Sequence, residues 1–217
     1  MDSLMPMKSS RKSNDLSGKP STVAILDAAQ RLFLEAGYDG VNLEQVGQAA
    51  GVSRQTVYNQ FGSKDAVFQE VVERHWQTVR QETASAFAEM ENLQSPAAML
   101  RSFASALLRF VTETDQVAFT RLVIAESRSR PWIAAEFYRA GKEPILRAFA
   151  GALAAMTSKG LLTCAQPELA AHQFMGLVQE FVIWPKVMAI GDALAELPPS
   201  EVVIDEAVTM FLKRYGA

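Results

Sequence analysis

The chain has 217 residues, of which 49% are apolar and 21% are charged, and its formal net charge at pH 7 is −3. A chain of this length can bury a substantial core as one or two domains, and its balance of apolar and charged residues excludes a disordered protein. The single cysteine, Cys164, excludes an internal disulfide and fits a reducing cytoplasm, where we expect the protein to act. With only two histidines a metal site would depend on carboxylates, so we expect neither a metal nor a cofactor.

Residues 1–20 are rich in Ser, Lys, Gly and Pro and show no apolar periodicity, so we expect a disordered N-terminal arm. They lack the apolar run of a secretory signal, and no stretch of the chain reaches roughly 18 uninterrupted apolar residues, so no membrane partner is expected. The basic residues of the arm suit contact with phosphates or a minor groove. A plain solvated tail is the alternative that the composition favours.

The first predicted helix begins after Pro20, with Ser21 as its N-cap, and ends at Gly37, which can adopt the left-handed conformation that follows a helix. Its apolar residues recur at helical spacing and form one stripe: Ile25, Ala28, Ala29, Leu32, Phe33 and Ala36. We expect this helix to support the two shorter helices that follow, since helices of about two turns are not stable alone.

A short helix is predicted to follow Asn42. Asn42 is its expected N-cap, and Gln45, three residues later, can complete a capping box. Its buried stripe is expected to consist of Leu43, Val46, Ala49 and Ala50. Gly51 supplies the left-handed conformation that ends this helix without steric cost.

A second short helix follows the turn, with Ser53 as its expected N-cap. Its buried side is expected to carry Val57 and Phe61, which are four residues apart. Its open side carries Arg54, Gln55, Thr56, Tyr58 and Asn59. Solvated faces of small helices are usually rich in Lys and Glu, whereas these side chains pair with base edges and phosphates. The segment is therefore typical of a helix-turn-helix that places its second helix in the DNA major groove, with an ordinary helical corner as the alternative.

The chemistry of each side chain suggests its place on DNA. The residues expected at base edges are Arg54 and Gln55, and those expected at bases or the sugar-phosphate backbone are Thr56 and Asn59. The residues expected at phosphates are Ser53, Tyr58, Lys64 and, through a helix N-terminus, Asn42. Net charge does not predict this binding, because residues 1–66 hold seven basic and seven acidic residues.

The run from Ile25 to Lys64 resembles the DNA-binding domain of the tetracycline-repressor (TetR/AcrR) family. The matching features are Ala28-Ala29, Leu32-Phe33, Gly37-Tyr38, the turn from Ala49 to Ser53, Thr56-Val57-Tyr58, Phe61 and Ser63-Lys64-Asp65. The resemblance implies a transcriptional regulator that binds double-stranded DNA. Gln55 and Gln60 depart from the commonest family pattern, which leaves the fold intact and the operator sequence open.

A long helix is predicted to start at Ser63 and to continue from the DNA-binding module without a flexible linker. Later helices are predicted after Ser95-Pro96, from about Asp115, after Pro131 with an interruption near Gly141 and Pro144, after Pro167 and from about Ser200. The fold is therefore expected to be all-α. Its parts are an arm at 1–20, a helix-turn-helix domain at 21–66 and a helical effector-binding and dimerisation domain at 67–217.

Residues 121–153 and 167–181 are similar to the C-terminal domain of the AefR-like branch of the same family. This similarity implies a domain that binds a small effector and pairs with a second copy. Candidates for the effector site are Trp76, Phe103, Leu107, Phe119, Phe137 and Phe174, although core packing is the commoner role for each. Candidates for the dimer interface are Phe181, Trp184, Val187, Val203, Val208 and Phe211.

Two other classes of function were open at the level of sequence. An enzyme is disfavoured because the chain has no HExxH, GxSxG, P-loop, CxxC or GxGxxG pattern. A helical adaptor would use the same open helix face for a protein partner, and only DNA binding would weaken steeply with salt. The sequence favours a homodimeric repressor that leaves a pseudo-palindromic operator when a small, largely apolar effector binds.

Overall fold

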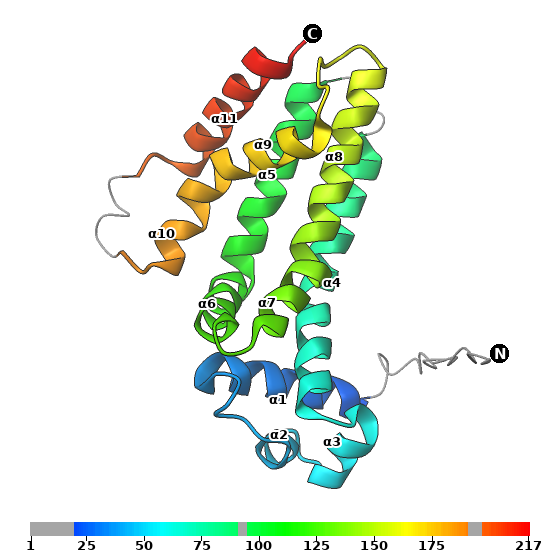
Figure 1. Ribbon diagram of the computed structural model, residues 1–217, viewed down its shortest axis with the longest axis vertical. Helices are drawn as coiled ribbons and strands as arrows, with labels where there is room; N and C mark the ends of the chain where they lie inside the picture. Colours follow the sequence, from blue (N-terminus) through cyan, green and yellow to red (C-terminus); the bar gives the residue numbers. More distant parts are fainter. Residues whose placement is uncertain (1–19, 91–94, 191–196) are drawn as a thin grey trace, which may run out of the picture.

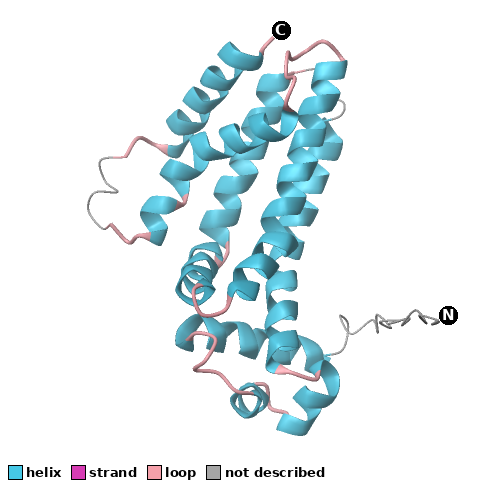
Figure 2. Cartoon of the chain, viewed as in Figure 1, coloured by secondary structure: helices cyan, strands magenta, loops and turns pink. Residues whose placement is uncertain are grey.

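The computed structural model describes residues 20–90, 95–190 and 197–217, with the backbone alone for residues 78, 79 and 82–90 (Figure 1). The elements are α1 (Pro20–Ala36), α2 (Leu43–Ala49), α3 (Arg54–Phe61), α4 (Lys64–Met90), α5 (Pro96–Glu113), α6 (Gln116–Ser127), α7 (Pro131–Phe137), η1 (Tyr138–Lys142), α8 (Glu143–Ser158), α9 (Pro167–Val182), α10 (Trp184–Val187) and α11 (Ser200–Tyr215). Within these ranges there is no strand, only an isolated bridge between Leu162 and Gly216 (Figure 2). The predicted all-α fold is confirmed, whereas the predicted arm lies almost wholly outside the described residues.

The molecule is elongated, and α1, α2 and α3 gather at one end of it (Figure 1). α4 begins beside α3 and continues along α5 and α8, so one helix belongs to both ends. Ser63 caps α4 as predicted, because its Oγ accepts a hydrogen bond from Ala66 N–H at 3.1 Å. No helix in the described ranges is long and apolar enough to cross a lipid bilayer.

α1 begins at Pro20, so the prediction that Ser21 caps it is wrong. The fixed backbone angle of proline suits the first position of a helix, where its missing N–H costs no hydrogen bond. Ser21 Oγ instead accepts a hydrogen bond from Gln60 Nε2 at 3.2 Å, and Thr22 Oγ1 donates to Gln60 Oε1 at 3.0 Å. Gln60 therefore ties α3 to the start of α1. The predicted end at Gly37 is confirmed by its φ of 72°.

An aromatic cluster joins the α1–α3 end to the rest of the molecule. Phe33 of α1 and Phe68 of α4 meet edge to face, with ring centroids 5.1 Å apart. Tyr38, in the loop after α1, packs against both of them. Trp132 of α7 packs on Tyr38 and Phe68, at 5.5 and 5.7 Å. Because Trp132 belongs to the helices behind the α1–α3 end, the two parts share one packed core.

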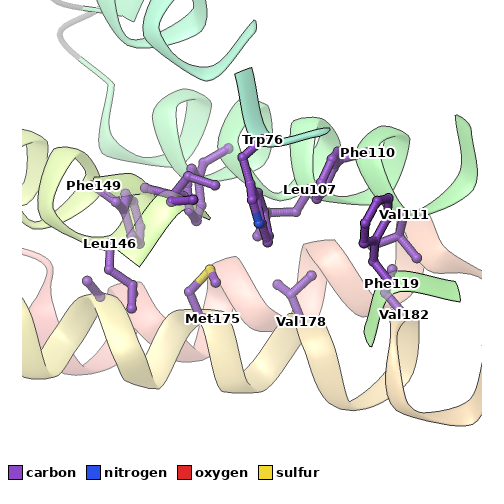
Figure 3. Packing of buried hydrophobic residues seen from close by; sticks show 14 of the residues in the cluster. Trp76, Leu107, Phe110, Val111, Phe119, Leu146, Phe149, Met175, Val178 and Val182 are labelled. Carbon is purple, nitrogen blue, oxygen red and sulfur yellow. The ribbon is translucent and has the colours of Figure 1, made fainter. Parts of the chain in front are cut away.

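The helical body consists of α4 to α11 and has a second aromatic core. Phe103 and Phe149 stack with centroids 3.9 Å apart, and Phe174 lies beside both and against Phe211. These four rings are 2% exposed or less. Figure 3 shows part of this packing, with Leu107 and Phe110 of α5 on one side and Met175 and Val178 of α9 on the other. Burying one such side chain contributes about 1.5–3 kcal/mol.

α7 continues into α8 through the π-helical turn η1. Pro144 has no N–H to donate to the Ala140 carbonyl, four residues earlier, as a regular helix requires. The guanidinium of Arg80 on α4 donates to that carbonyl instead. The interruption predicted near Gly141 and Pro144 is therefore a widened turn of a continuous helical run.

Candidate nucleic-acid interface

α2 starts with the capping box predicted at Asn42. The side-chain oxygen of Asn42 accepts hydrogen bonds from the N–H groups of Glu44 and Gln45, both at 3.0 Å. The Gln45 side chain accepts in return from Asn42 N–H at 2.8 Å. Two N–H groups at the start of α2 are thus satisfied within the protein, so a phosphate at this position would meet the side-chain amide of Asn42 and not an open helix terminus.

The buried side of α2 differs by one residue from the prediction. Val46 is fully buried, but Ala49 is exposed. Gly47 takes the buried position, and a Cβ there would lie 2.9 Å from the Val52 carbonyl oxygen. Gly47 therefore lets α2 approach the turn before α3 more closely than any other residue would, and apolar periodicity carries no signal for it.

α3 presents the polar face predicted for it. Ser53 caps the helix by accepting from Thr56 N–H at 3.1 Å, and Val57 anchors the inner side with 0% exposure. The exposed residues of the outer side are Arg54, Gln55, Tyr58 and Asn59, and Thr56 is half-buried. The outer face offers hydrogen-bond donors and acceptors without an acidic side chain, which suits base edges and phosphates.

Two of the predicted DNA-contacting side chains are linked to each other in the free protein. Gln55 Nε2 donates to Asn59 Oδ1 at 2.7 Å, one turn further along α3. The bond leaves the Gln55 oxygen and the Asn59 amide nitrogen for other partners. The hydroxyl oxygens of Ser53 and Thr56 are likewise 2.9 Å apart. Side chains held in this way lose less conformational entropy when a partner binds.

Lys64 is turned partly inward, beside the loop that precedes α2. Its ammonium donates to the carbonyl oxygens of Tyr38 and Val41, both at 3.0 Å, and lies 4.2 Å from the centre of the Tyr38 ring. Two of its three N–H bonds are thus used, which leaves one for the predicted phosphate contact. Lys64, Arg54 and Asn42 line one surface hollow of about 440 Å³, so these three predicted residues do come together.

Tyr38 connects the α1–α3 end to α6, a role that the sequence did not reveal. Its N–H donates to Glu126 Oε1 at 2.9 Å, and its hydroxyl donates to Asp65. Burial, followed by this hydrogen bond, raises the pKa of the Tyr38 hydroxyl. Glu126 also accepts from Arg130 at 3.0 Å, and Arg130 binds both oxygens of Asp39 at 2.6 Å. The Tyr38–Glu126 partners are 88 residues apart, so no local pattern signals the contact.

The helical body contains a cavity of about 170 Å³, with walls from α4 to α10 that are mostly apolar. Three of the six effector-site candidates line it: Trp76, Leu107 and Phe137. The other three, Phe103, Phe119 and Phe174, are 1% exposed or less, pack within the aromatic cores and are not among the residues that line this cavity, so their role in effector binding stays a prediction. Lining residues that the sequence did not single out include Phe110, Gln116, Lys142 and Met175.

The predicted dimer residues fall into two groups. The first group is exposed or half-buried and consists of Phe181 at 43% exposure, Trp184 at 40% exposure and Val187. The second group is buried within the chain and consists of Val203, Val208 and Phe211, at 6%, 2% and 2% exposure, so their role in a dimer interface stays a prediction. They lie on the side of α11 that packs against α5 and α9. The exposed apolar side chains of α11 are Val202 and Met210, at 49% and 54%.

Two family descriptions match the chain. Residues 25–71 match the family described as bacterial regulatory proteins, tetR family, and residues 98–217 match the AefR-like transcriptional repressor, C-terminal domain. The second match alone covers more than half of the chain. The protein belongs to the TetR family. Both resemblances seen in the sequence are confirmed, and this TetR-family protein is a helix-turn-helix transcriptional regulator and not an enzyme.

Helix-turn-helix regulators of Mycobacterium tuberculosis (strain ATCC 25618 / H37Rv) share parts of the sequence. The chain is 44% identical over 46 residues to the HTH-type transcriptional regulator AlkX, across 21% of this chain and 22% of AlkX. It is 31% identical over 130 residues to the HTH-type transcriptional regulator Rv1255c, across 59% of this chain and 58% of that relative. The chain therefore aligns with less than two-thirds of the length of these curated relatives.

Solved structures of regulators match nearly the whole chain, and two of the three described here are described as TetR-family. A regulator from Mesorhizobium loti MAFF303099 has a TM-score of 0.78 and 26% identity, with 91% of this chain and 97% of that chain covered. The flavonoid-responsive regulator FrrA has a TM-score of 0.71 and 28% identity, with 90% and 97% covered. A regulator from Pseudomonas syringae pv. tomato str. DC3000 has a TM-score of 0.70 and 26% identity, with 89% and 96% covered. The order of helices described above is thus that of the TetR-family fold.

Proposed function

We propose that this TetR-family protein acts in the cytoplasm as a homodimeric repressor, which occupies a pseudo-palindromic operator until a small effector binds the helical body. The observation that carries the proposal is the outer face of α3. Arg54, Gln55, Tyr58 and Asn59 are exposed there on a helix whose inner side is anchored by the fully buried Val57. A helix of this kind enters the major groove as the recognition helix, while the helix before it crosses the DNA backbone.

The side chains of the recognition helix divide into those that read bases and those that position the protein. Arg54 and Gln55 read base edges, because guanidinium and amide groups form paired hydrogen bonds with guanine and adenine. Asn59, linked to Gln55, and Thr56 contact bases or the sugar-phosphate backbone. The phosphate contacts come from Asn42, Ser53, Tyr58 and the remaining N–H of Lys64, and they fix the register on DNA without reading its sequence.

The surface chemistry of the C-terminal helices supports dimerisation. Seven of the eleven large apolar side chains that are exposed in the described ranges lie in the last part of the chain: Leu169, Phe181, Trp184, Met188, Ile190, Val202 and Met210. Exposed apolar side chains in such number suit a subunit interface. A second copy seated on α9 and α11 completes a four-helix bundle. Its two recognition helices would enter successive major grooves at a separation of about 34–36 Å.

Two helices connect the cavity with the α1–α3 end. α4 places Trp76 in the cavity wall and Phe68 in the aromatic cluster, about 12 Å apart along the helix. α6 places Gln116 in the wall and Glu126 at Tyr38. An effector that shifts either helix therefore changes the placement of α3. A coupling of about 1–3 kcal/mol between the two sites lowers operator affinity roughly 5–150-fold.

The names of relatives support an effector-responsive regulator. FrrA is described as flavonoid-responsive. Rv1474c of Mycobacterium tuberculosis is named a repressor, and FasR of Mycolicibacterium smegmatis is named an activator. We favour repression because the family that matches residues 98–217 is described as a transcriptional repressor.

Selection of bound duplexes from a random DNA pool tests the proposal. We expect a pseudo-palindrome with half-site centres about 10 base pairs apart, or a multiple of that spacing. Binding should weaken steeply with added salt, because each phosphate contact releases counterions. Enrichment of no sequence, or binding that does not depend on salt, would contradict the proposal and favour a protein partner for α3.

A further inference from the structure

The cavity wall contains a buried polar group that the protein itself does not satisfy. Trp76 is 4% exposed, and within the described part of the chain its Nε1–H has no hydrogen-bond acceptor. Native proteins keep few such groups, and each one calls for an explanation. Figure 3 shows the indole between α5 and α9, where Met175 and Val178 face it.

The indole is held by its neighbours and cannot turn toward another acceptor. One face lies against Gly141, where an added Cβ would come within 2.0 Å of two ring carbons. Phe110 and Phe137 pack on the same indole, with ring centroids 5.1 and 4.9 Å away. Gly141 belongs to the π-helical turn η1, and turns of this type frequently occur at functional sites. The N–H donor is therefore a fixed feature of the wall.

Of the other polar groups of the wall, Gln116 is satisfied within the protein and Lys142 adds a charged donor. Gln116 accepts from His75 Nε2 at 2.9 Å and donates to Thr120 at 3.1 Å, so the protein satisfies it. Lys142 is the single charged residue among the described residues of the lining, which include no Asp or Glu. In the same ranges Lys142 forms no ion pair with a carboxylate. Lys142 and Trp76 line the same cavity.

We infer that the effector is a small aromatic acid of one or two rings, whose carboxylate accepts a hydrogen bond from Trp76 Nε1 and pairs with Lys142. This effector class rests on the function proposed above. An apolar cavity of about 150 Å³ holds benzene, so a cavity of about 170 Å³ suits one ring or two fused rings. Aromatic walls favour a flat ring. The cavity wall has the donors of Trp76 and Lys142 and, among the described residues, no acidic side chain. Such a wall favours an anionic ligand over a cationic one, because a charged acceptor forms the stronger hydrogen bond.

Calorimetric titration of the full-length protein, without DNA, tests this effector class with three matched compounds. They are 1-naphthoate, 1-naphthamide and 1-naphthylmethylammonium, which share a ring system and differ in the head group. We expect 1-naphthoate to bind about tenfold more tightly than 1-naphthamide, and the cation to show no measurable binding. Trp76→Phe should weaken 1-naphthoate about tenfold, because it removes the N–H and keeps an aromatic ring. Lys142→Met should abolish the preference for the acid over the amide.

Phe137→Leu and Lys159→Met are the matched controls. Phe137 lines the cavity without a polar atom, so its variant should weaken the acid and the amide by the same factor. Lys159 is exposed and lies outside the lining, so its variant should change neither. Circular dichroism checks the fold of each variant. If Trp76→Phe does not fold, the inferred effector class is tested by the head-group preference of Lys142→Met alone.

Three results would overturn the inference. The cation binds as tightly as the acid, or the folded Trp76 and Lys142 variants keep the wild-type head-group preference, or neither 1-naphthoate nor its one-ring analogue benzoate binds at millimolar concentration. Failure of the proposed function has a different signature. In that case the wild-type protein selects no palindrome from random DNA, whatever the titrations of the DNA-free protein show.

Discussion

Arg54 is the first residue of α3, and its side chain is exposed beside the polar residues of the outer face. Arg54→Ala should cost about 1–3 kcal/mol of operator affinity and relax the preference at one base pair, because a guanidinium contact with a base edge is lost. The stability of the fold should not change. Affinities for a set of single-base operator variants test this prediction. Equal weakening across the whole set would contradict a base contact.

Lys64 lies in a different environment from Arg54, so replacing it should have a different effect on DNA binding and on stability. Lys64→Ala should weaken binding to all DNA sequences alike, since a phosphate contact carries no sequence information. It should also lower the free energy of unfolding by about 1–3 kcal/mol, because the carbonyls of Tyr38 and Val41 lose their donor. Urea unfolding measures this loss, with Arg54→Ala as the control. A Lys64→Ala protein as stable as the wild type would contradict the structural role.

His75 makes the stability of the helical body depend on pH. It is 8% exposed, stacks on Phe119 with ring centroids 4.1 Å apart and donates from Nε2 to Gln116. Burial lowers the pKa of His75, against smaller raising effects of Gln116 and Asp115. Below about pH 6.5 the unfolded chain therefore binds a proton that the folded chain does not. Stability should be full above that pH and fall as the pH drops toward the lowered pKa.

We expect the melting temperature to fall more in the wild type than in His75→Gln when the pH is lowered from about 7.5 to about 5.5. His172, the other histidine, is exposed, so His172→Gln should follow the wild type. Comparing variants over the same pH range removes the contribution of the carboxylates. An equal fall in the wild type and in His75→Gln would show that His75 is not the group responsible.

Among the elements, the turn η1 fixes the position of the Trp76 indole, because Gly141 of this turn lies against the ring. Gly141→Ala should lower the free energy of unfolding by about 1–3 kcal/mol, because the added Cβ overlaps the indole. Gly151 is the matched control, since it lies in α8 and a Cβ there meets no atom within 4 Å. Gly151→Ala should raise stability by roughly 0.5–1 kcal/mol. Urea unfolding of both variants tests the contrast, and a Gly141→Ala protein that is stabilised like Gly151→Ala would refute it.

The helix-turn-helix was predictable from the sequence because its signals are local. The capping box at Asn42, the cap at Ser53 and the buried position of Val57 each depend on residues within one or two turns of one another. The exposed face of α3 followed from the same spacing. The start of α1 was missed by a single position, because Pro20 and Ser21 both carry start signals and the contact of Ser21 with Gln60 lies 39 residues away.

The helical body was less predictable because its contacts join distant parts of the chain. Periodicity indicated several apolar sides on the last helices, but it did not show which side packs within the same chain. α5 and α9 cover the side of α11 that holds Val203, Val208 and Phe211. In the same way, apolar spacing did not separate the cavity-lining Trp76 from the core residue Phe103. That difference arises only when α4 to α10 are packed together.

For the whole molecule, the proposed function requires two recognition helices presented together. Joining two binding modules makes the second contact intramolecular and strengthens binding roughly 10²–10⁴-fold over either module alone. Met210 is 54% exposed on α11, and Met210→Glu should separate the subunits because it places a charge in an apolar interface. Ile124→Glu is the matched control, since Ile124 is 53% exposed on α6 and should leave the dimer intact.

The most direct measurement compares a full palindromic operator with a single half-site, by the mass of each complex in sedimentation and by its affinity. We predict two chains on the full operator, bound roughly 10²–10⁴-fold more tightly than the half-site. Met210→Glu should lose this advantage and Ile124→Glu should keep it. A single chain on the full operator, or equal wild-type affinity for the operator and the half-site, would contradict a pair of recognition helices as the basis of function.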